Sequence, residues 1–133
     1  MELAGADKAP ELKSAGKPLV FPRQERLKGR DEIREVFKSG RAVSGSGAKL
    51  FTLKNGLSHN RIAFAVPRKF GNAVERNRTR RLGREAYRHL RQEIKPGHDL
   101  VLLVYSGNDD FPFRMTQLGY LFNRAGLFNR KQK

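Results

Sequence analysis

The sequence contains no cysteine and no tryptophan, and its acidic residues are outnumbered by basic residues, with 13 Asp and Glu against 28 Lys and Arg. Without cysteine, the chain cannot form disulfides, use a cysteine nucleophile or bind a metal through thiolates. No stretch approaches the roughly 20 consecutive apolar residues of a membrane-spanning helix. The first residues mix Glu and Asp with Lys and Pro and contain no apolar segment typical of a secretory signal. We therefore expect a cytoplasmic protein with no membrane partner.

The excess of basic residues gives a formal net charge of +15 over 133 residues and a pI of about 11.0. A pI above about 9 is typical of nucleic-acid-binding domains. The simpler alternative is a basic protein kept soluble by self-repulsion. Because the basic residues are clustered rather than scattered, their distribution favours a nucleic acid as the partner.

The densest cluster is the 24-residue segment 68–91, which contains nine Lys or Arg and two Glu. Asn72 followed by Glu75 is a capping-box pattern, which predicts that a long helix begins here and runs to about Ile94, before Pro96 and Gly97. At 100° per residue, one arc of this helix is predicted to face the core: Leu82, Gly83, Ala86, Leu90 and Ile94. A neighbouring arc is basic: Arg76, Arg80, Arg84, Arg88 and Arg91, extended by Asn77 and Arg81, with Arg78 beyond.

This arginine stripe has almost no acidic residues at the i,i+4 spacing that would pair with its charges. Like charges at that spacing repel, so an anionic partner would relieve a cost in the free protein. The arginine guanidinium also suits phosphate better than the lysine ammonium does, because it can form two parallel hydrogen bonds.

Outside this helix, the sequence predicts a single domain over residues 23–128, with a disordered or extended N-terminal tail over 1–22 and a basic tail over 129–133. A short helix is expected from about Asp31 to Gly40 and a last helix from about residue 113. Strands are expected within residues 41–54, over 61–66 and over 99–105. The last is continuously apolar and is therefore predicted to be central and covered on both faces.

Two features bear on the kind of nucleic acid and on catalysis. Lys49 and Phe51 share one face of a predicted strand, a combination of phosphate contact and stacking surface that suits unpaired nucleotides, although Phe51 could equally be a core residue. The histidines are scattered, and Asp109–Asp110 is interpreted as a cap or turn. No metal-ligand spacing and no nucleophile motif occurs, so no catalytic side chain and no metal site on the protein are predicted.

The order of residues in RKFGNAVERNRTRRLGREAYR resembles the RNR signature of the bacterial ribonuclease P protein subunit. The match comprises Arg68-Lys69, Gly71 to Val74, Arg76-Asn77-Arg78, Arg80-Arg81-Leu82 and Arg84 to Arg88. Segments 26–43, 61–71 and 96–105 resemble further parts of the family, so the resemblance covers about residues 23–128. Two departures are that Ile33 stands where the family commonly has Phe, and Gly83 where a larger apolar residue is usual.

The resemblance implies an α+β fold: a small two-layer α/β sandwich of about four strands and three helices, like the second domain of ribosomal protein S5, with a left-handed βαβ crossover. It also implies a protein subunit of an endoribonuclease in which the catalytic RNA carries the active site, binds most of the Mg²⁺ and removes the 5′ leader of precursor tRNA. Two sets of site residues follow. The catalytic RNA is expected to contact Arg68, Lys69, Asn72, Arg76, Asn77, Arg78, Arg80, Arg81, Arg84 and Arg88, and the leader Ile33, Phe37, Lys49 and Phe51.

The expected partners are thus the catalytic RNA and precursor tRNA, and no protein partner is evident. The main alternative is a non-catalytic structural RNA-binding protein of the ribosomal type, which net charge alone does not distinguish. A DNA-binding module is disfavoured because no groove-reading motif is recognisable.

Overall fold

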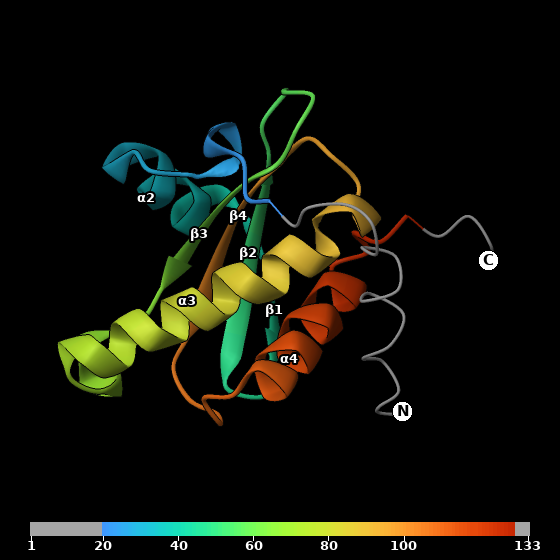
Figure 1. Cartoon of the computed structure of the whole chain (residues 1–133). Helices are drawn as coiled ribbons and strands as arrows, with labels where there is room; N and C mark the ends of the chain where they lie inside the picture. The colour runs from blue at the N-terminus through green and yellow to red at the C-terminus, as the bar shows by residue number, and fades with distance from the viewer. Residues whose placement is uncertain (1–19, 130–133) are drawn as a thin grey trace.

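The structure, a computed structural model, describes residues 20–129. A four-stranded sheet forms its centre, built from β1 (Arg41–Gly45), β2 (Ala48–Lys54), β3 (Arg61–Ala65) and β4 (His98–Val104). Helices α3 (Ala73–Leu90) and α4 (Phe111–Arg124) lie side by side on one face of this sheet, and the shorter α2 (Arg30–Ser39) lies on the other (Figure 1). Short 3-10 turns η1 (Arg23–Glu25), η2 (Arg68–Phe70) and η3 (Arg91–Glu93) complete the described elements. The predicted α+β sandwich is confirmed, with α2 adding a partial third layer.

The strand order is β1-β2-β4-β3, so the last strand in the chain occupies an interior position. β4 pairs with β2 in antiparallel fashion and with β3 in parallel fashion. In Figure 1, β3 and β4 both run downward, β4 lies to the right of β3, and α3 returns upward in front of the sheet. This β3–α3–β4 connection is therefore left-handed, whereas nearly all such connections in proteins are right-handed.

The alternation predicted for β2 is present and separates two apolar clusters. Ala48 and Leu50 belong to the larger core under α3 and α4, whereas Phe51 and Leu53 pack with Val101 on the α2 side. Because successive side chains of a strand point to opposite faces, one seven-residue strand supports both layers. β4 contributes to both clusters as well, which confirms that this strand is covered on its two faces.

The N-terminal boundary of the packed chain differs from the expectation. Residues 1–19, most of the predicted tail, lie outside the described residues, as do residues 130–133 of the C-terminal tail. Phe21, however, is only 7% exposed and packs edge-on against Tyr87 and Phe64. The chain is therefore anchored to the core already at Phe21, which the sequence analysis had assigned to the tail.

The buried face of α3 also differs from the predicted arc. The buried positions of the helix are Thr79, Gly83, Ala86, Tyr87 and Leu90, whereas Leu82 is only half-buried. The helix ends at Leu90 rather than near Ile94, and η3 carries the chain on to a buried Ile94. Neither Thr79 nor Tyr87 belongs to the predicted core arc, and the hydroxyl groups of both find carboxylate partners.

Gly83 marks a place where α3 lies in close contact with the sheet. A β-carbon at this position would lie 2.8 Å from the Phe64 ring of β3, closer than such atoms pack. The absence of a side chain at residue 83 therefore lets the Phe64 ring fit beneath the helix.

Candidate RNA interface

The start of α3 is fixed by the predicted capping box. The Asn72 side chain accepts a hydrogen bond from the Glu75 backbone N–H, and the Glu75 carboxylate accepts one from the Asn72 N–H, both at 2.8 Å. The expected RNA contact Asn72 thus has its side-chain oxygen engaged in holding the helix terminus. Glu75, the only acidic residue in the first turn, is engaged in the same way.

The side chains predicted to contact the catalytic RNA differ in exposure. Arg68 and Lys69 in η2, and Asn77, Arg78 and Arg81 in α3, are exposed. Arg76, Arg80, Arg84 and Arg88 are half-buried, and three of them are held within the protein. Arg76 donates to the Gly71 carbonyl, Arg80 to the Asn77 side-chain oxygen and Arg88 to Glu85. These contacts pre-orient part of the stripe before any ligand binds.

Arg84 is the exception within this set. It has no carboxylate partner among the described residues, and burial together with the nearby guanidinium groups of Arg26, Arg80, Arg88 and Arg81 lowers its pKa. A lowered pKa means that the charged form is disfavoured by its surroundings. An anion bound at this position would remove that penalty.

Arg84 lies on a groove of about 500 Å³ at the β3 side of the sheet. Arg80, Arg84 and Arg88 of α3 line one side, Arg26 and Lys28 the other, and no acidic residue takes part. The remaining lining is apolar and comprises Phe21, Leu27, Ile33, Ile62, Ala63 and Phe64. The groove therefore offers cations around an apolar floor, which suits the phosphates and bases of an unpaired strand.

The residues predicted to contact the leader gather on the α2 side of the sheet. Phe37 of α2 and Phe51 of β2 form an edge-to-face pair with ring centroids 4.8 Å apart. Phe37 is 38% exposed, whereas Phe51 is half-buried and packs against the small cluster of Val36 and Val101. Lys49 lies two residues from Phe51 on the same strand face. Phe51 is thus both a partial core residue and part of an accessible aromatic pair.

Ile33 joins the two surfaces. It packs on the α2-side cluster with Phe51 and also lines the groove beside Arg80 and Arg84. The sequence analysis had assigned these arginines and Ile33 to different RNAs. The structure places them in one groove, so the two sets of residues are contiguous.

One arginine of the predicted stripe faces a carboxylate instead of solvent. Arg91 forms an ion pair with Glu25 at 2.7 Å, and the buried Tyr87 hydroxyl donates to the same carboxylate at 2.7 Å. Burial would raise the pKa of Glu25, but the hydrogen bonds from Arg91 and Tyr87 outweigh it, so the pKa is lowered. The pairing was invisible in the sequence because Glu25 lies 66 residues before Arg91.

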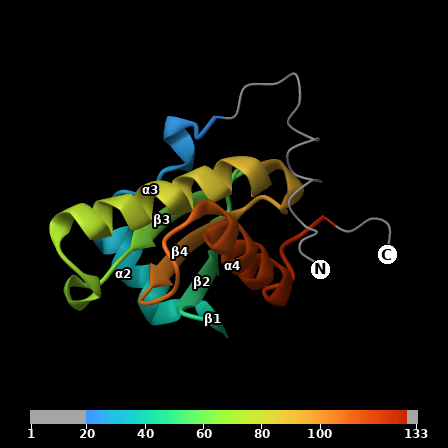
Figure 2. The ribbon, with the colours of Figure 1, turned by 60° about the horizontal axis from the view of Figure 1, so that its bottom comes forward.

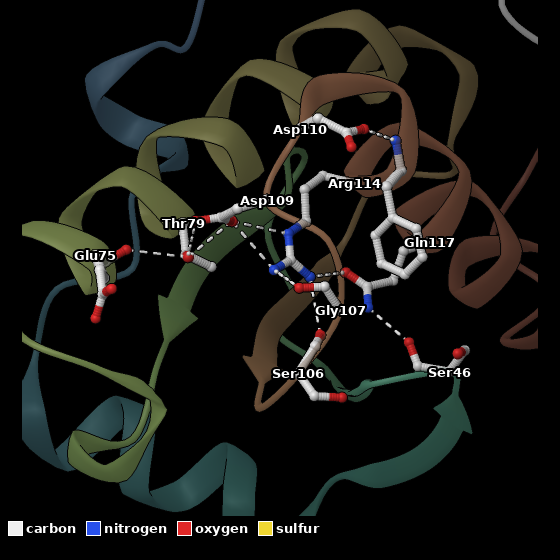
Figure 3. A network of polar contacts seen from close by, with 10 residues as sticks. Ser46, Glu75, Thr79, Ser106, Gly107, Asp109, Asp110, Arg114 and Gln117 are labelled. Atoms are coloured by element: carbon white, nitrogen blue, oxygen red, sulfur yellow. Dashed lines mark hydrogen bonds and ion pairs between the residues drawn. The ribbon is translucent and has the colours of Figure 1, made fainter.

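A second internal network was also missed (Figure 3). Arg114 of α4 is only 2% exposed and binds Asp109, which accepts a hydrogen bond from Thr79 of α3. Asp110 caps α4 by accepting from the Phe113 N–H at 2.8 Å, in agreement with the interpretation of this acidic pair as a cap or turn. The signal in the sequence was an arginine and a glutamine, Arg114 and Gln117, on the same helix face as several apolar residues.

Among the described residues, no group of three or more His, Asp or Glu side chains is arranged to hold a metal ion. No helix in the described part of the chain is long and apolar enough to cross a membrane.

An arginine-lined helix across a mixed sheet, a cationic groove and an accessible aromatic pair define a small basic RNA-binding α+β domain. Residues 21–126 match the family described as Ribonuclease P, and the chain belongs to this family. This membership confirms the resemblance found in the sequence.

Individual relatives agree with this assignment. The ribonuclease P protein component of Clostridioides difficile is 36% identical over 95 residues, covering 71% of this chain and 83% of the relative. That of Syntrophomonas wolfei is 33% identical over 113 residues, or 84% of this chain and 95% of the relative. Among solved structures, the RNase P protein from Thermotoga maritima aligns with a TM-score of 0.69 at 30% identity, over 75% of this chain and 96% of that one. The RNase P protein from Staphylococcus aureus has a TM-score of 0.68 at 24% identity, which supports the fold alone.

Proposed function

We propose that this protein is the protein subunit of ribonuclease P, working in the cytoplasm beside a catalytic RNA. In this proposal the α3 stripe and η2 bind the catalytic RNA, while the groove and the α2 face of the sheet bind the 5′ leader of precursor tRNA. The protein thereby assists endonucleolytic removal of the leader.

The observation that carries this proposal is the internal use of the acidic side chains. Glu25 pairs with an arginine of η3, Glu85 with one of α3 and Asp109 with one of α4, whereas Glu75 and Asp110 cap helices. The remaining acids with described contacts, Asp31, Glu32, Glu35 and Asp99, also bond within the protein. The exposed cations of η2 and α3 are therefore left for an external anion.

The leader surface is supported by the aromatic pair and the groove. Stacking of a base on an aromatic side chain contributes about 1–3 kcal/mol and tolerates any base, as a leader of variable sequence requires. Phe37 presents such a ring, supported from below by Phe51 at 4.8 Å between centroids. Lys49 beside it and the arginines of the groove are available for the phosphates.

In this proposal the Mg²⁺ is bound mainly by the RNA, because among the described residues no three His, Asp or Glu side chains are grouped to hold a metal ion. The phosphates of the RNA are the alternative ligands, and Mg²⁺ held there would activate the water for phosphodiester hydrolysis. The contribution of this chain is to bring two polyanions together by lowering their repulsion.

The first experiment measures cleavage of precursor tRNA at low Mg²⁺ by the cognate catalytic RNA, with and without the protein. We expect strong stimulation by the protein and no cleavage by the protein alone. Cleavage by RNA-free protein would overturn the proposal, and binding to ribosomal RNA without stimulation would favour the structural alternative.

The second experiment compares Phe51→Ala with wild type on precursors of graded leader length. Affinity should fall with the leader present and stay unchanged for mature tRNA, since only the precursor offers nucleotides to stack. Phe128→Ala is the matched control, because this ring packs on Phe122 at the α4 side of the sheet. Equal weakening of precursor and mature tRNA by Phe51→Ala would mean that Phe51 acts only in the core.

A further inference from the structure

Arg114 is the one arginine of the described chain that is almost completely buried, at 2% exposure. Burying a guanidinium without partners is very costly, and the Arg114 guanidinium has several hydrogen-bond partners. It lies 3.1 Å from Asp109 Oδ1 and donates to the carbonyls of Ser106 and Gly107 and to the Gln117 side chain at 3.0–3.3 Å. Arg114 thereby fixes the loop between β4 and α4.

The same network reaches two further parts of the fold (Figure 3). The Thr79 hydroxyl lies 2.9 Å from both carboxylate oxygens of Asp109, which attaches the loop to α3. The Gln117 amide donates to the Ser46 carbonyl at 2.6 Å, which attaches it to the turn between β1 and β2. The guanidinium of Arg114 also lies 6.0 Å from the centroid of the Phe70 ring in η2.

Thr79 has a particular place in the RNA interface. It lies between Arg78 and Arg80, and it is the first buried residue of α3, because residues 73–78 are exposed or half-buried. The N-terminal end of α3 extends past the edge of the sheet (Figure 2). Counted from the N-terminus of α3, the hydrogen bond to Asp109 is therefore the first among the described residues that joins the helix to a residue distant in the chain.

We infer that Arg114 and Asp109 are positioning residues for RNA binding: acting through Thr79 and Phe70, they fix the N-terminal half of α3 and η2 where their cations meet RNA. This inference rests on the proposed function. A bidentate arginine–phosphate contact requires defined geometry, so a small shift of the helix end weakens several contacts together.

The test uses Thr79→Val, which removes the hydroxyl at nearly constant volume, and Thr79→Ser, which retains it. Tyr87→Phe is the matched control, because it also removes one hydroxyl-to-carboxylate hydrogen bond from α3, but in the C-terminal half of the helix. Affinity for the catalytic RNA and the melting temperature are measured for all, with binding performed well below every melting temperature.

We expect Thr79→Val to bind the catalytic RNA about tenfold to a hundredfold more weakly, as loss of one hydrogen bond to a charged group implies. Its salt dependence should also be flatter, because phosphate contacts are lost. Thr79→Ser and Tyr87→Phe should bind like wild type, although Tyr87→Phe lowers the melting temperature. Asp109→Asn should weaken binding as well, and adding it to Thr79→Val should have little further effect.

Wild-type affinity in Thr79→Val with a lowered melting temperature would overturn the inference, because the network would then be structural only. Equal losses in Thr79→Val and Tyr87→Phe would overturn it as well. If wild type itself fails to bind the catalytic RNA, the proposed function fails, which is a separate outcome. Should Thr79→Val not fold, Asp109→Asn against Tyr87→Phe decides the question in the same way.

Discussion

Replacing Gly83 and Gly119 with alanine, one at a time, should change stability in opposite directions. Both glycines lie inside α-helices, Gly83 in α3 and Gly119 in α4. Alanine is favoured over glycine in a helix by about 1 kcal/mol, so helix propensity alone would make both variants more stable. The surroundings differ, because a β-carbon at Gly119 would meet nothing within 4 Å, whereas one at Gly83 would lie 2.8 Å and 3.0 Å from two atoms of the Phe64 ring.

The size of each effect follows from these distances. For Gly119→Ala we expect a gain of about 1 kcal/mol, which in a domain of this size raises the melting temperature by about 4 °C. For Gly83→Ala the ring must move, and overpacking of a core typically costs about 1–3 kcal/mol. Since this exceeds the propensity gain over most of its range, Gly83→Ala should be destabilised by up to about 2 kcal/mol.

Thermal and urea unfolding of the two variants provide the measurement. The double variant Phe64→Leu with Gly83→Ala should be more stable than Phe64→Leu alone, because the ring that obstructs the new methyl group is absent. Because Phe64 also lines the cationic groove, Gly83→Ala should in addition weaken leader binding more than Gly119→Ala does. If Gly83→Ala is as stabilising as Gly119→Ala, helix and sheet are not in the close contact described.

Three further outcomes are expected. Replacing Arg76, Arg78 and Arg80 together with alanine should weaken catalytic-RNA binding and reduce the salt dependence of the affinity by about one unit of slope per lost phosphate contact. Arg124→Ala on α4 is the control. An unchanged slope in the triple variant would mean that the stripe is merely solvated. Sulfate should raise the melting temperature above that in chloride of equal ionic strength, because anion binding stabilises the folded state; equal melting temperatures would argue against a preformed anion site. Because the pKa of Glu25 is lowered from 4.5 in the folded protein, its carboxylate contributes stability at neutral pH that is lost as pH falls through the folded-state pKa. Glu25→Gln should therefore be less stable than wild type at pH 7, and this difference should shrink as the pH falls below 4.5, as unfolding measured across the range will show.

The features predicted correctly from the sequence depend on neighbouring residues. The capping box joins Asn72 and Glu75, which are only three positions apart, and the two faces of β2 follow from simple alternation. The continuous apolar run of β4 marked it as a central strand for the same reason. The cationic residues of α3 could be recognised because their spacing and their lack of local acidic partners are both visible in the sequence.

The features missed depend on residues far apart in the chain. Arg91 appeared to belong to the RNA-binding stripe until Glu25 was found against it, and Thr79 appeared unremarkable until Asp109 was found beside its hydroxyl. Gly83 appeared to be only a weak helix position, because nothing in the sequence placed Phe64 beneath it. Periodicity indicates which side of a helix is apolar, but it does not reveal which distant partner satisfies a buried polar group.

The interior position of β4 has a consequence for the synthesis of the protein. Among the described residues, β4 is the only strand that pairs with β3, apart from a single bridge between Ile62 and Arg26, and the whole of α3 separates β3 from β4. As the chain emerges from the ribosome, β3 and the arginine helix are therefore exposed before the strand that joins them to β2 is made. A chain ending before His98 lacks the centre of the sheet, so folding must wait until most of the protein has been translated. During this interval the helix is already strongly cationic and lies next to the RNA of the ribosome, and premature contacts there would compete with completion of the fold.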